Sequence, residues 1–440
     1  MIRTALFKRS IATQASPKPV ITKLSNGIIV ATKPNTSSST SSVGLVFGSG
    51  ASSENPYNNG VSKLLSNIFI KDDLKATQAG FVLNSTVGKE FQSFIVSSSS
   101  SNVSKSLEYL QSKLANPVGS ESKFSETLAF TLQETKAFEE TKHAERVIEH
   151  LHSTAFQNTP LSLPTVGTVE SLEGLAASDV TSFSESQFVA SNAVIVGSGN
   201  VNHDELVKAT ESVLSLSSKA KVSPTKKSTF LGSEIRLRDD TLPKAYISIA
   251  AEGEPVSSPN YYVAQVAAKV FGSFISSEPA SRLQGIKLLD DIQEYHLADT
   301  FNHFSYSYKE AGLWGFETTT SNVGQIDDLV HFTLKQWNRL SISITDTEVA
   351  RGKSLLKLAL ASASTSDAVI ATTLGSKLLA GAKTDLAEEF AKIDAVTAKD
   401  IKAWASERLW DQDIAIAGTG QIEDLFDYNR IRNDMSMMRW

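Results

Sequence analysis

Histidine is the residue type best able to bind a metal ion or move a proton near neutral pH, and this 440-residue chain has seven histidines and no cysteine. The lack of cysteine excludes disulfides, thiolate catalysis and Fe–S ligation. His150 and His152 stand two positions apart, whereas chelation from a helix needs a spacing of three or four. His143 fits neither H-x-x-E-H nor H-E-x-x-H, and no ligand spacing is found at the remaining four: His203, His296, His303 and His331. We predict structural or solvated roles for all seven.

Two other patterns, a partial nucleotide-binding motif and a possible catalytic triad, are only weak indications of a functional site. Gly197-Ser198-Gly199 resembles the start of a dinucleotide-binding fingerprint, but Asn202 stands where the third glycine belongs. The same pattern recurs at Gly418–Gly420, so we interpret both as a repeated strand-to-helix turn. The sequence does not exclude a Ser/His/Asp catalytic triad, because residues far apart in the chain can form one in the folded protein. No G-x-S-x-G nucleophile elbow is present.

That recurrence is part of a longer internal repeat. Leu172–Val201 matches Ile393–Ile422 without a gap, at a constant offset of 221 positions that also pairs Asp179 with Asp400. The period is too long for a solenoid and fits a duplicated domain of about half the chain. Function is therefore expected either between two homologous halves or in only one of them.

Strand and helix signals alternate along both halves. Residues 21–31 form a predicted hairpin around Asn26-Gly27, residues 41–50 a strand, and residues 59–69 a helix. Residues 126–152 contain no glycine or proline, which predicts one or two surface helices. The pattern indicates α+β lobes with mixed or antiparallel sheets. We expect the first lobe over 19–214, a Ser/Lys-rich linker over 215–229 and the second lobe over 230–440.

Composition restricts the location and the partners. A net charge of −6 argues against nucleic-acid binding. The sequence contains no apolar run of 18 residues, so we expect no transmembrane helix in this chain. Residues 1–18 are basic and amphipathic, and the first acidic residue of the chain is Glu54. This segment is predicted to be a mitochondrial transit peptide, the alternative being a disordered basic tail.

Three segments carry a resemblance to a known family. FGSGASSENPYNNGVSKLLSNIFIKDD (47–73), HLHSTAFQNTPLSLPTVGT (150–168) and FSYSYKEAGLWGF (304–316) resemble the pitrilysin-type zinc metallopeptidases, which include the mitochondrial processing peptidases. The resemblance spans the whole chain after the leader. It implies a pitrilysin-like fold of two homologous α+β lobes enclosing a cavity, which accounts for the repeat.

The family's zinc motif, H-x-x-E-H, is lost here. The resemblance puts Lys63 at the first histidine, Ser66 at the general-base glutamate and Asn67 at the second histidine, with the distal glutamate ligand near Glu134. A catalytic zinc needs three protein ligands and a carboxylate to take a proton from its water. We therefore predict an inactive metallopeptidase homologue without catalytic, cofactor-binding or metal-binding residues.

Two further runs resemble one non-catalytic branch of the family. RVIEHLHSTAFQNTPLSLPT (146–165) and DYNRIRNDMSMMRW (427–440) are similar to the fungal core subunits of mitochondrial ubiquinol–cytochrome c reductase, respiratory complex III. This implies a structural role at the matrix side of the inner membrane. The partners it implies are core protein 2, cytochrome b, cytochrome c1 and the Rieske protein, and no cofactor is expected on this chain.

Two questions stay open at this point. The alternative function is a processing-peptidase subunit that binds or cleaves presequences, with Glu139, Glu140 and Glu145 attracting basic leaders unless they are only a solvated helix face. The methionine-rich C-terminus, including Met435 and Trp440, suits either a docking tail or packing against its own lobe.

Overall fold

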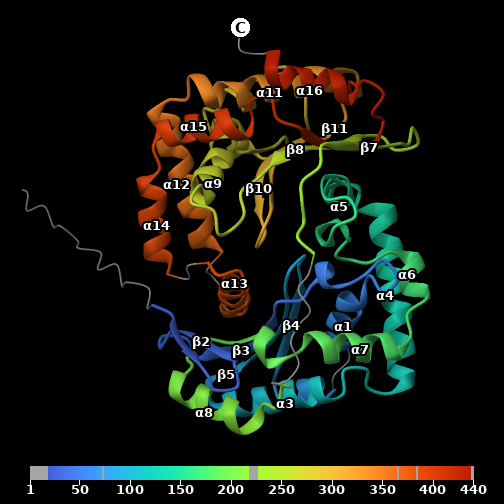
Figure 1. Ribbon diagram of the computed structural model, residues 1–440, viewed down its shortest axis with the longest axis vertical. Helices are drawn as coiled ribbons and strands as arrows, with labels where there is room; N and C mark the ends of the chain where they lie inside the picture. The colour runs from blue at the N-terminus through green and yellow to red at the C-terminus, as the bar shows by residue number, and fades with distance from the viewer. Residues whose placement is uncertain (1–17, 72–73, 218–225, 364–365, 383–384, 438–440) are drawn as a thin grey trace, which may run out of the picture.

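The computed structural model describes residues 18–71, 74–217, 226–363, 366–382 and 385–437, and these form two six-stranded sheets. Figure 1 shows one sheet in each half of an elongated molecule, with helices on the outer side of both sheets and between them. The predicted transit peptide lies outside the described residues except for Lys18, and so does the middle of the predicted linker, 218–225.

The first sheet has the strand order β1-β2-β6-β3-β5-β4, in which only β2 and β6 run parallel. Its strands are β1 Val20–Lys23, β2 Ile29–Pro34, β3 Thr40–Phe47, β4 Val82–Val87, β5 Gln92–Ser99 and β6 Ala193–Gly199. The predicted hairpin is confirmed, because β1 pairs with β2 across Gly27, whose φ of 94° suits glycine.

The second sheet has the order β7-β12-β8-β11-β10-β9, in which only β7 and β12 run parallel. Its strands are β7 Ser233–Arg238, β8 Ala245–Glu252, β9 Ser273–Ile275, β10 Thr300–Ser307, β11 Gly312–Thr320 and β12 Ile414–Gly420. Five strands match the first sheet in order and direction. The predicted fold class of two homologous lobes with mixed sheets is therefore confirmed.

The helices follow the same duplication. In the first half they are α1 Val61–Ile70, α2 Leu74–Gln78, α3 Val103–Ala115, α4 Glu121–Thr141, α5 His143–Ala155, α6 Val169–Glu173, α7 Ala177–Gln187 and α8 His203–Val213. In the second half they are α9 Tyr261–Phe271, α10 Lys287–Glu294, α11 Ile326–Ile342, α12 Asp346–Ser362, α13 Asp367–Leu379, α14 Leu386–Ala395, α15 Ala398–Arg408 and α16 Tyr428–Met437. The bounds of α7 and β6, shifted by the offset of the sequence repeat, are those of α15 and β12.

Glycine ends both repeated strands for a steric reason. Gly199 and Gly420 have φ of +84° and +92°, and a Cβ atom would lie 2.4 Å from the Thr40 carbonyl oxygen or 2.2 Å from the Lys244 carbonyl oxygen. The second glycine of each G-x-G pattern thus allows a close approach to the neighbouring strand. This explains the pattern without a nucleotide.

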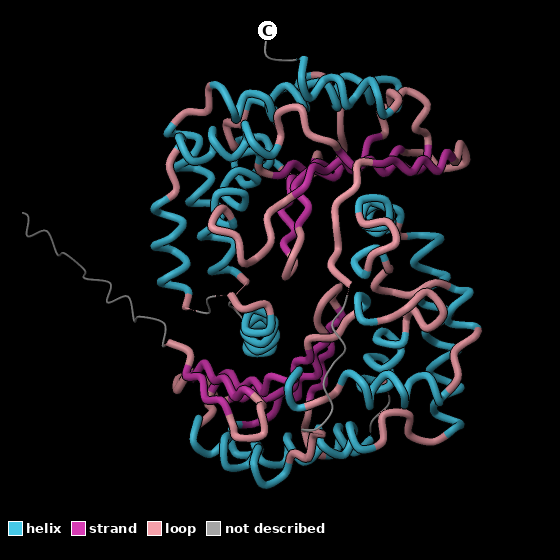
Figure 2. Tube along the Cα trace, in the orientation of Figure 1, coloured by secondary structure: helices cyan, strands magenta, loops and turns pink. Residues whose placement is uncertain are grey.

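The two halves exchange one helix each. α13 of the second half covers the inner face of the first sheet, where Ala371 and Leu374 pack with Val46 and Val196. α5 of the first half covers the inner face of the second sheet, where Leu151 packs among residues of β8, β11 and β12. Both helices lie between the sheets in Figures 1 and 2. The outer faces are covered by each half's own helices.

The prediction of surface helices over 126–152 is wrong for α5. Val147, Leu151 and Ala155 are buried there, and their spacing of four places them on one face against the second sheet. By contrast, α4 leaves most of its residues outside the core, and its Glu140 is exposed. Glu145, in the first turn of α5, is exposed as well. The sequence prediction missed the core position of α5 because its apolar stripe is narrow and charged residues occupy the rest of the helix.

A cavity of about 320 Å³ lies between the halves. Its wall includes Lys89 and Phe91 from the first half and Tyr262, Tyr308 and Glu389 from the second. Among the described residues, no single helix has the length and apolar character needed to cross a bilayer. One sharply bent pair, α12 with α13, meets that test only when both helices are counted together.

The exchanged helix α13 makes a testable close contact. Gly375 faces β3, and a Cβ atom there would lie 2.4 Å from Val46 Cγ2 and 2.7 Å from Val46 Cβ. We expect Gly375→Ala to lower the free energy of unfolding by about 1–3 kcal/mol through overpacking, measured by urea denaturation. Gly324→Ala is the matched control, since its nearest neighbour, Asp424 Oδ2, would be at an ordinary 3.8 Å. Equal stability of the two variants would contradict tight packing of α13 on this sheet.

Candidate functional site

Helix α1, which carries the three lost motif positions, is held by core packing and by a buried cap. Leu64, Leu65 and Phe69 point into the first core. The N-terminus is capped by Glu54: its Oε2 accepts from the Gly60 backbone N at 2.8 Å, and its Oε1 accepts from the Ser62 backbone N at 2.7 Å. Carboxylates stabilise helix N-termini because the amides there have no partner within the helix. The polar side of α1 is thereby fixed towards α4.

The structure brings together three of the four residues that the resemblance places at the family's zinc-site positions. Lys63 Nζ lies 3.3 Å from Glu134 Oε2, and Asn67 Nδ2 donates to the same oxygen at 2.7 Å. Asn67 Nδ2 also donates to Thr131 Oγ1 at 2.9 Å. Glu134 therefore stands opposite the two positions that the family's histidines occupy, as the resemblance implied, and its carboxylate contacts an ammonium group and an amide.

This constellation does not fit a catalytic metal ion. Only Glu134 offers an anionic ligand there, and the Lys63 ammonium would repel a divalent cation placed between the same groups. Ser66, at the general-base position, is buried and has no carboxylate. Nowhere in the described part of the chain do three or more His, Cys, Asp or Glu side chains gather as a possible metal site.

The histidines take structural positions that sequence spacing did not reveal. His152 on α5 is buried, with Nδ1 2.7 Å from the Ile148 carbonyl oxygen and Nε2 2.6 Å from the Tyr308 hydroxyl. Burial, with Lys89 nearby, lowers the pKa of His152 to about 4. His303 is also buried: Trp337 Nε1 donates to its Nε2 at 3.0 Å, and its ring stacks on Phe271.

A buried ion pair that sequence reasoning missed lies beside the cavity. Lys89 Nζ, in the turn between β4 and β5, donates to Glu149 Oε2 on α5 at 2.5 Å and to the Leu163 carbonyl oxygen at 2.7 Å. Burial would raise the pKa of Glu149, but Lys89, His152 and Thr165 outweigh it and the pKa is lowered. The absence of a sequence signal is understandable, because the partners are 60 positions apart. The pair connects α5, which packs on the second sheet, to the β4–β5 turn of the first sheet.

Comparison with known proteins places both halves in one family. Residues 29–169 match the family model described as "Insulinase (Peptidase family M16)", and residues 174–356 match "Peptidase M16 inactive domain". The chain belongs to the M16 peptidase family. The fold and the degenerate α1 are therefore those of an M16 member.

Three relatives and structures show which M16 proteins are similar over the full length. The chain is 60% identical to cytochrome b-c1 complex subunit 1 of Saccharomyces cerevisiae, over 99% of this chain and 97% of the relative. It is 34% identical to the mitochondrial-processing peptidase subunit beta of Neurospora crassa, over 98% and 94%. A chain in the structure of Complex III2 from Candida albicans, Inz-5 bound, matches with a TM-score of 0.89 at 40% identity, covering 95% of this chain and 100% of that one.

The position of Glu134 predicts that two substitutions restore metal binding. Lys63→His with Asn67→His would present two imidazoles to Glu134, a His₂Glu ligand set. We expect about one zinc per chain in this variant by elemental analysis, and none in the unaltered chain. Adding Glu134→Gln should abolish binding, because a neutral amide is a poor zinc ligand. Zinc retained by the triple variant would mean that the metal sits elsewhere.

The Glu54 cap predicts a pH dependence of stability. Burial raises the pKa of Glu54 to about 7 from its ordinary 4.5, although four hydrogen bonds oppose the shift. The folded state therefore keeps a proton that the unfolded state releases, and this contribution, present below pH 4.5, is lost as the pH rises through about 7. Relative to Glu54→Gln, the unaltered chain should lose on the order of 3 kcal/mol over that range.

The measurement is urea denaturation of both proteins from pH 5 to pH 8. The opposite contribution of His152, whose depressed pKa makes stability fall as the pH drops, is present in both proteins and cancels in their difference. A difference that does not change with pH would show that Glu54 is ionised throughout.

Proposed function

We propose that this M16 member is core subunit 1 of mitochondrial respiratory complex III, ubiquinol–cytochrome c reductase. It supports assembly and stability of the complex without catalysing a reaction, while the redox centres of electron transport belong to other subunits. It pairs with core protein 2 at the matrix side of the inner membrane, in one assembly with cytochrome b, cytochrome c1 and the Rieske protein. Residues 1–18 are its transit peptide, and 19–214, 215–229 and 230–440 are its first lobe, linker and second lobe.

The single observation that carries this proposal is identity over nearly the whole chain. The similarity to cytochrome b-c1 complex subunit 1 of S. cerevisiae is 60%, against 34% to the processing peptidase subunit of N. crassa. The Lys63–Glu134–Asn67 arrangement supports the non-catalytic part, because hydrolysis needs both a bound zinc and a general base.

The rival is a processing-peptidase subunit that binds or cleaves presequences. Cleavage would need the zinc-binding and proton-accepting groups whose places Lys63, Ser66 and Asn67 take. Binding alone would need an acidic surface, and Glu140 and Glu145 on the first lobe are exposed. The alternative function that remains is therefore presequence binding without cleavage, with another subunit as the peptidase.

Affinity purification separates the two functions. A C-terminally extended, tagged chain is isolated from mitochondria in mild detergent, and a reduced-minus-oxidised absorbance spectrum is recorded. We expect b-type and c-type haem bands in near-constant ratio to the tagged chain, since the haems belong to tightly bound partners. A tagged soluble matrix protein serves as the control for carry-over.

A haem-free eluate containing one soluble partner that cleaves presequences would establish the rival function. Zinc bound to the unaltered chain itself, at one ion per chain, would overturn its assignment as non-catalytic.

A further inference from the structure

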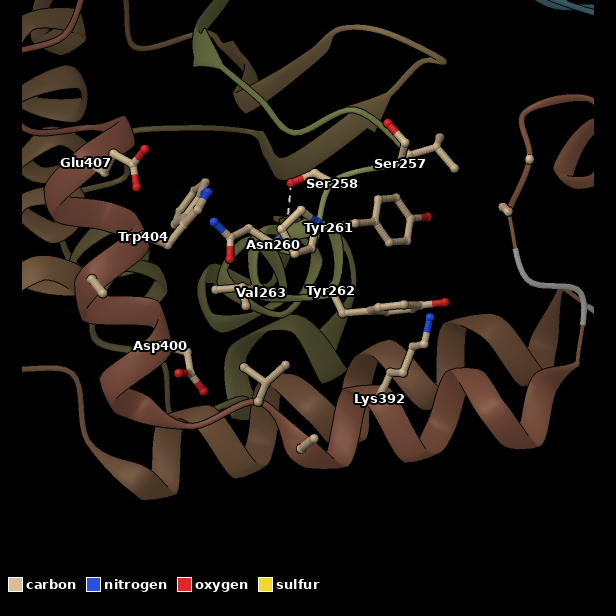
Figure 3. Close-up of a pocket in the computed structure, with 17 residues that line it drawn as sticks. Ser257, Ser258, Asn260, Tyr261, Tyr262, Val263, Lys392, Asp400, Trp404 and Glu407 are labelled. Atoms are coloured by element: carbon tan, nitrogen blue, oxygen red, sulfur yellow. Dashed lines mark hydrogen bonds between the residues drawn. The ribbon is translucent and has the colours of Figure 1, made fainter.

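The second half contains a pocket that the proposed function does not use. It has a volume of about 690 Å³ and lies between the segment before α9 and the helices α14 and α15. Figure 3 shows Asn260, Tyr261 and Tyr262 on one side of it, and Lys392 and Trp404 on the helices opposite. All its lining residues belong to the second half, whereas the cavity between the halves is lined from both. The two adjoin, because Val256, Tyr261, Tyr262 and Ala382 line both.

The equivalent place in the first half is filled by the chain itself. There Asn59 Nδ2 donates to the Pro164 carbonyl oxygen at 3.1 Å, and Ser171 Oγ donates to the Asn59 carbonyl oxygen at 2.7 Å. Gly167 packs so closely on Gly60 that a Cβ atom would lie 2.7 Å from the Gly60 Cα. The extended residues before α6 thus close the space beside the N-terminus of α1.

The corresponding connection in the second half is shorter. Residues 156–168 join α5 to α6, whereas only residues 380–385 join the equivalent helices α13 and α14. Lys392, one position before the sequence repeat begins in the second half, is exposed and lines the pocket. Among the described residues, the Asn260 side-chain amide at the N-terminus of α9 makes no hydrogen bond. The N-cap position of α1 in the first half is Gly60, and Asn59 beside it donates to the Pro164 carbonyl oxygen.

The two ends of the pocket differ in charge. At one end Lys392 Nζ lies 5.5 Å from the centre of the Tyr262 ring, and in Figure 3 it points towards the Tyr262 hydroxyl. At the other end α15 presents Asp400 and Glu407, both exposed, one on each side of Trp404. Asp400 already caps α15 through Thr397, which leaves Glu407 as the free carboxylate. The wall between them is formed by aromatic rings.

We propose that this pocket binds an extended peptide segment of a partner subunit, with an acidic residue at the Lys392 end and a basic residue at the Glu407 end. The first half indicates an extended chain as the occupant, and the bipolar lining indicates its charges. The Asn260 side-chain amide donates to a backbone carbonyl oxygen of the segment, as Asn59, beside the equivalent cap position of α1, donates to Pro164 in the first half. The proposal rests on the proposed function, which supplies the partner subunits.

Photo-crosslinking in the assembled complex tests the occupant directly. Benzoylphenylalanine is placed at Ser257, an exposed pocket residue, and the complex is purified through the tagged chain and irradiated. We expect one product with a partner subunit, mapped by mass spectrometry to a segment with acidic and basic residues a few positions apart. Ala403→Trp, which fills the pocket, should lower the yield about tenfold, as when an interface anchor is lost.

The matched control is Ser406→Trp, which adds the same side chain to α15 at an exposed position that does not line the pocket. It should leave the crosslink yield unchanged. A product insensitive to Ala403→Trp, a product with a second copy of this chain or with its own residues, or no partner product would each overturn the proposal. The haem spectrum of the same sample reports separately on the proposed function, because crosslinking can fail while the haem bands remain.

Discussion

The reciprocal exchange of α5 and α13 is the constraint on which the rest of the structure depends. Each sheet has two apolar faces, and each half's own helices cover only the outer one. The inner faces are buried by a helix from the opposite half, through Val147 and Leu151 in one case and Ala371 and Leu374 in the other. Uncovered, either face would be a large exposed apolar surface. The two halves are therefore joined through two shared cores, one on each inner face, beside the cavity between them.

The side chains at the three motif positions of α1 contact groups of the chain itself. Glu134 is paired with Lys63 and Asn67, so its carboxylate is neutralised by a cation that belongs to the chain. The Glu134 side chain is 38% exposed, so this pair contributes little to stability. The position of α1 depends on other features: its buried leucines and the Glu54 carboxylate beneath its first turn. The scaffold around α1 therefore does not depend on zinc ligands at the motif positions.

Much of the fold was predictable from the sequence, and the reasons are local. The gap-free repeat predicted two homologous lobes, and Asn26-Gly27 predicted the first hairpin, because both signals lie within short segments. The core role of α5 was not predictable, since Val147 and Leu151 pack on β8, β11 and β12, which begin at positions 245, 312 and 414, far along the chain. The site was found only as far as the family resemblance reached. The Lys89–Glu149 pair depends on a contact between residues 60 positions apart, which no sequence motif indicates. The pocket beside α9 depends on the length of a connection, which no motif indicates either.

The exchange of helices also sets the order in which the polypeptide can mature. A chain made or imported from its N-terminus presents all strands of the first sheet once Gly199 has emerged, yet the inner face of that sheet stays uncovered until α13 has followed, with Leu379 its last residue. Such a half-finished intermediate exposes β-branched side chains to neighbouring chains, which favours aggregation. The first half is consequently expected to be prone to aggregation until the second half is present. A truncated product ending before α13 would be a target for proteolysis rather than a stable domain.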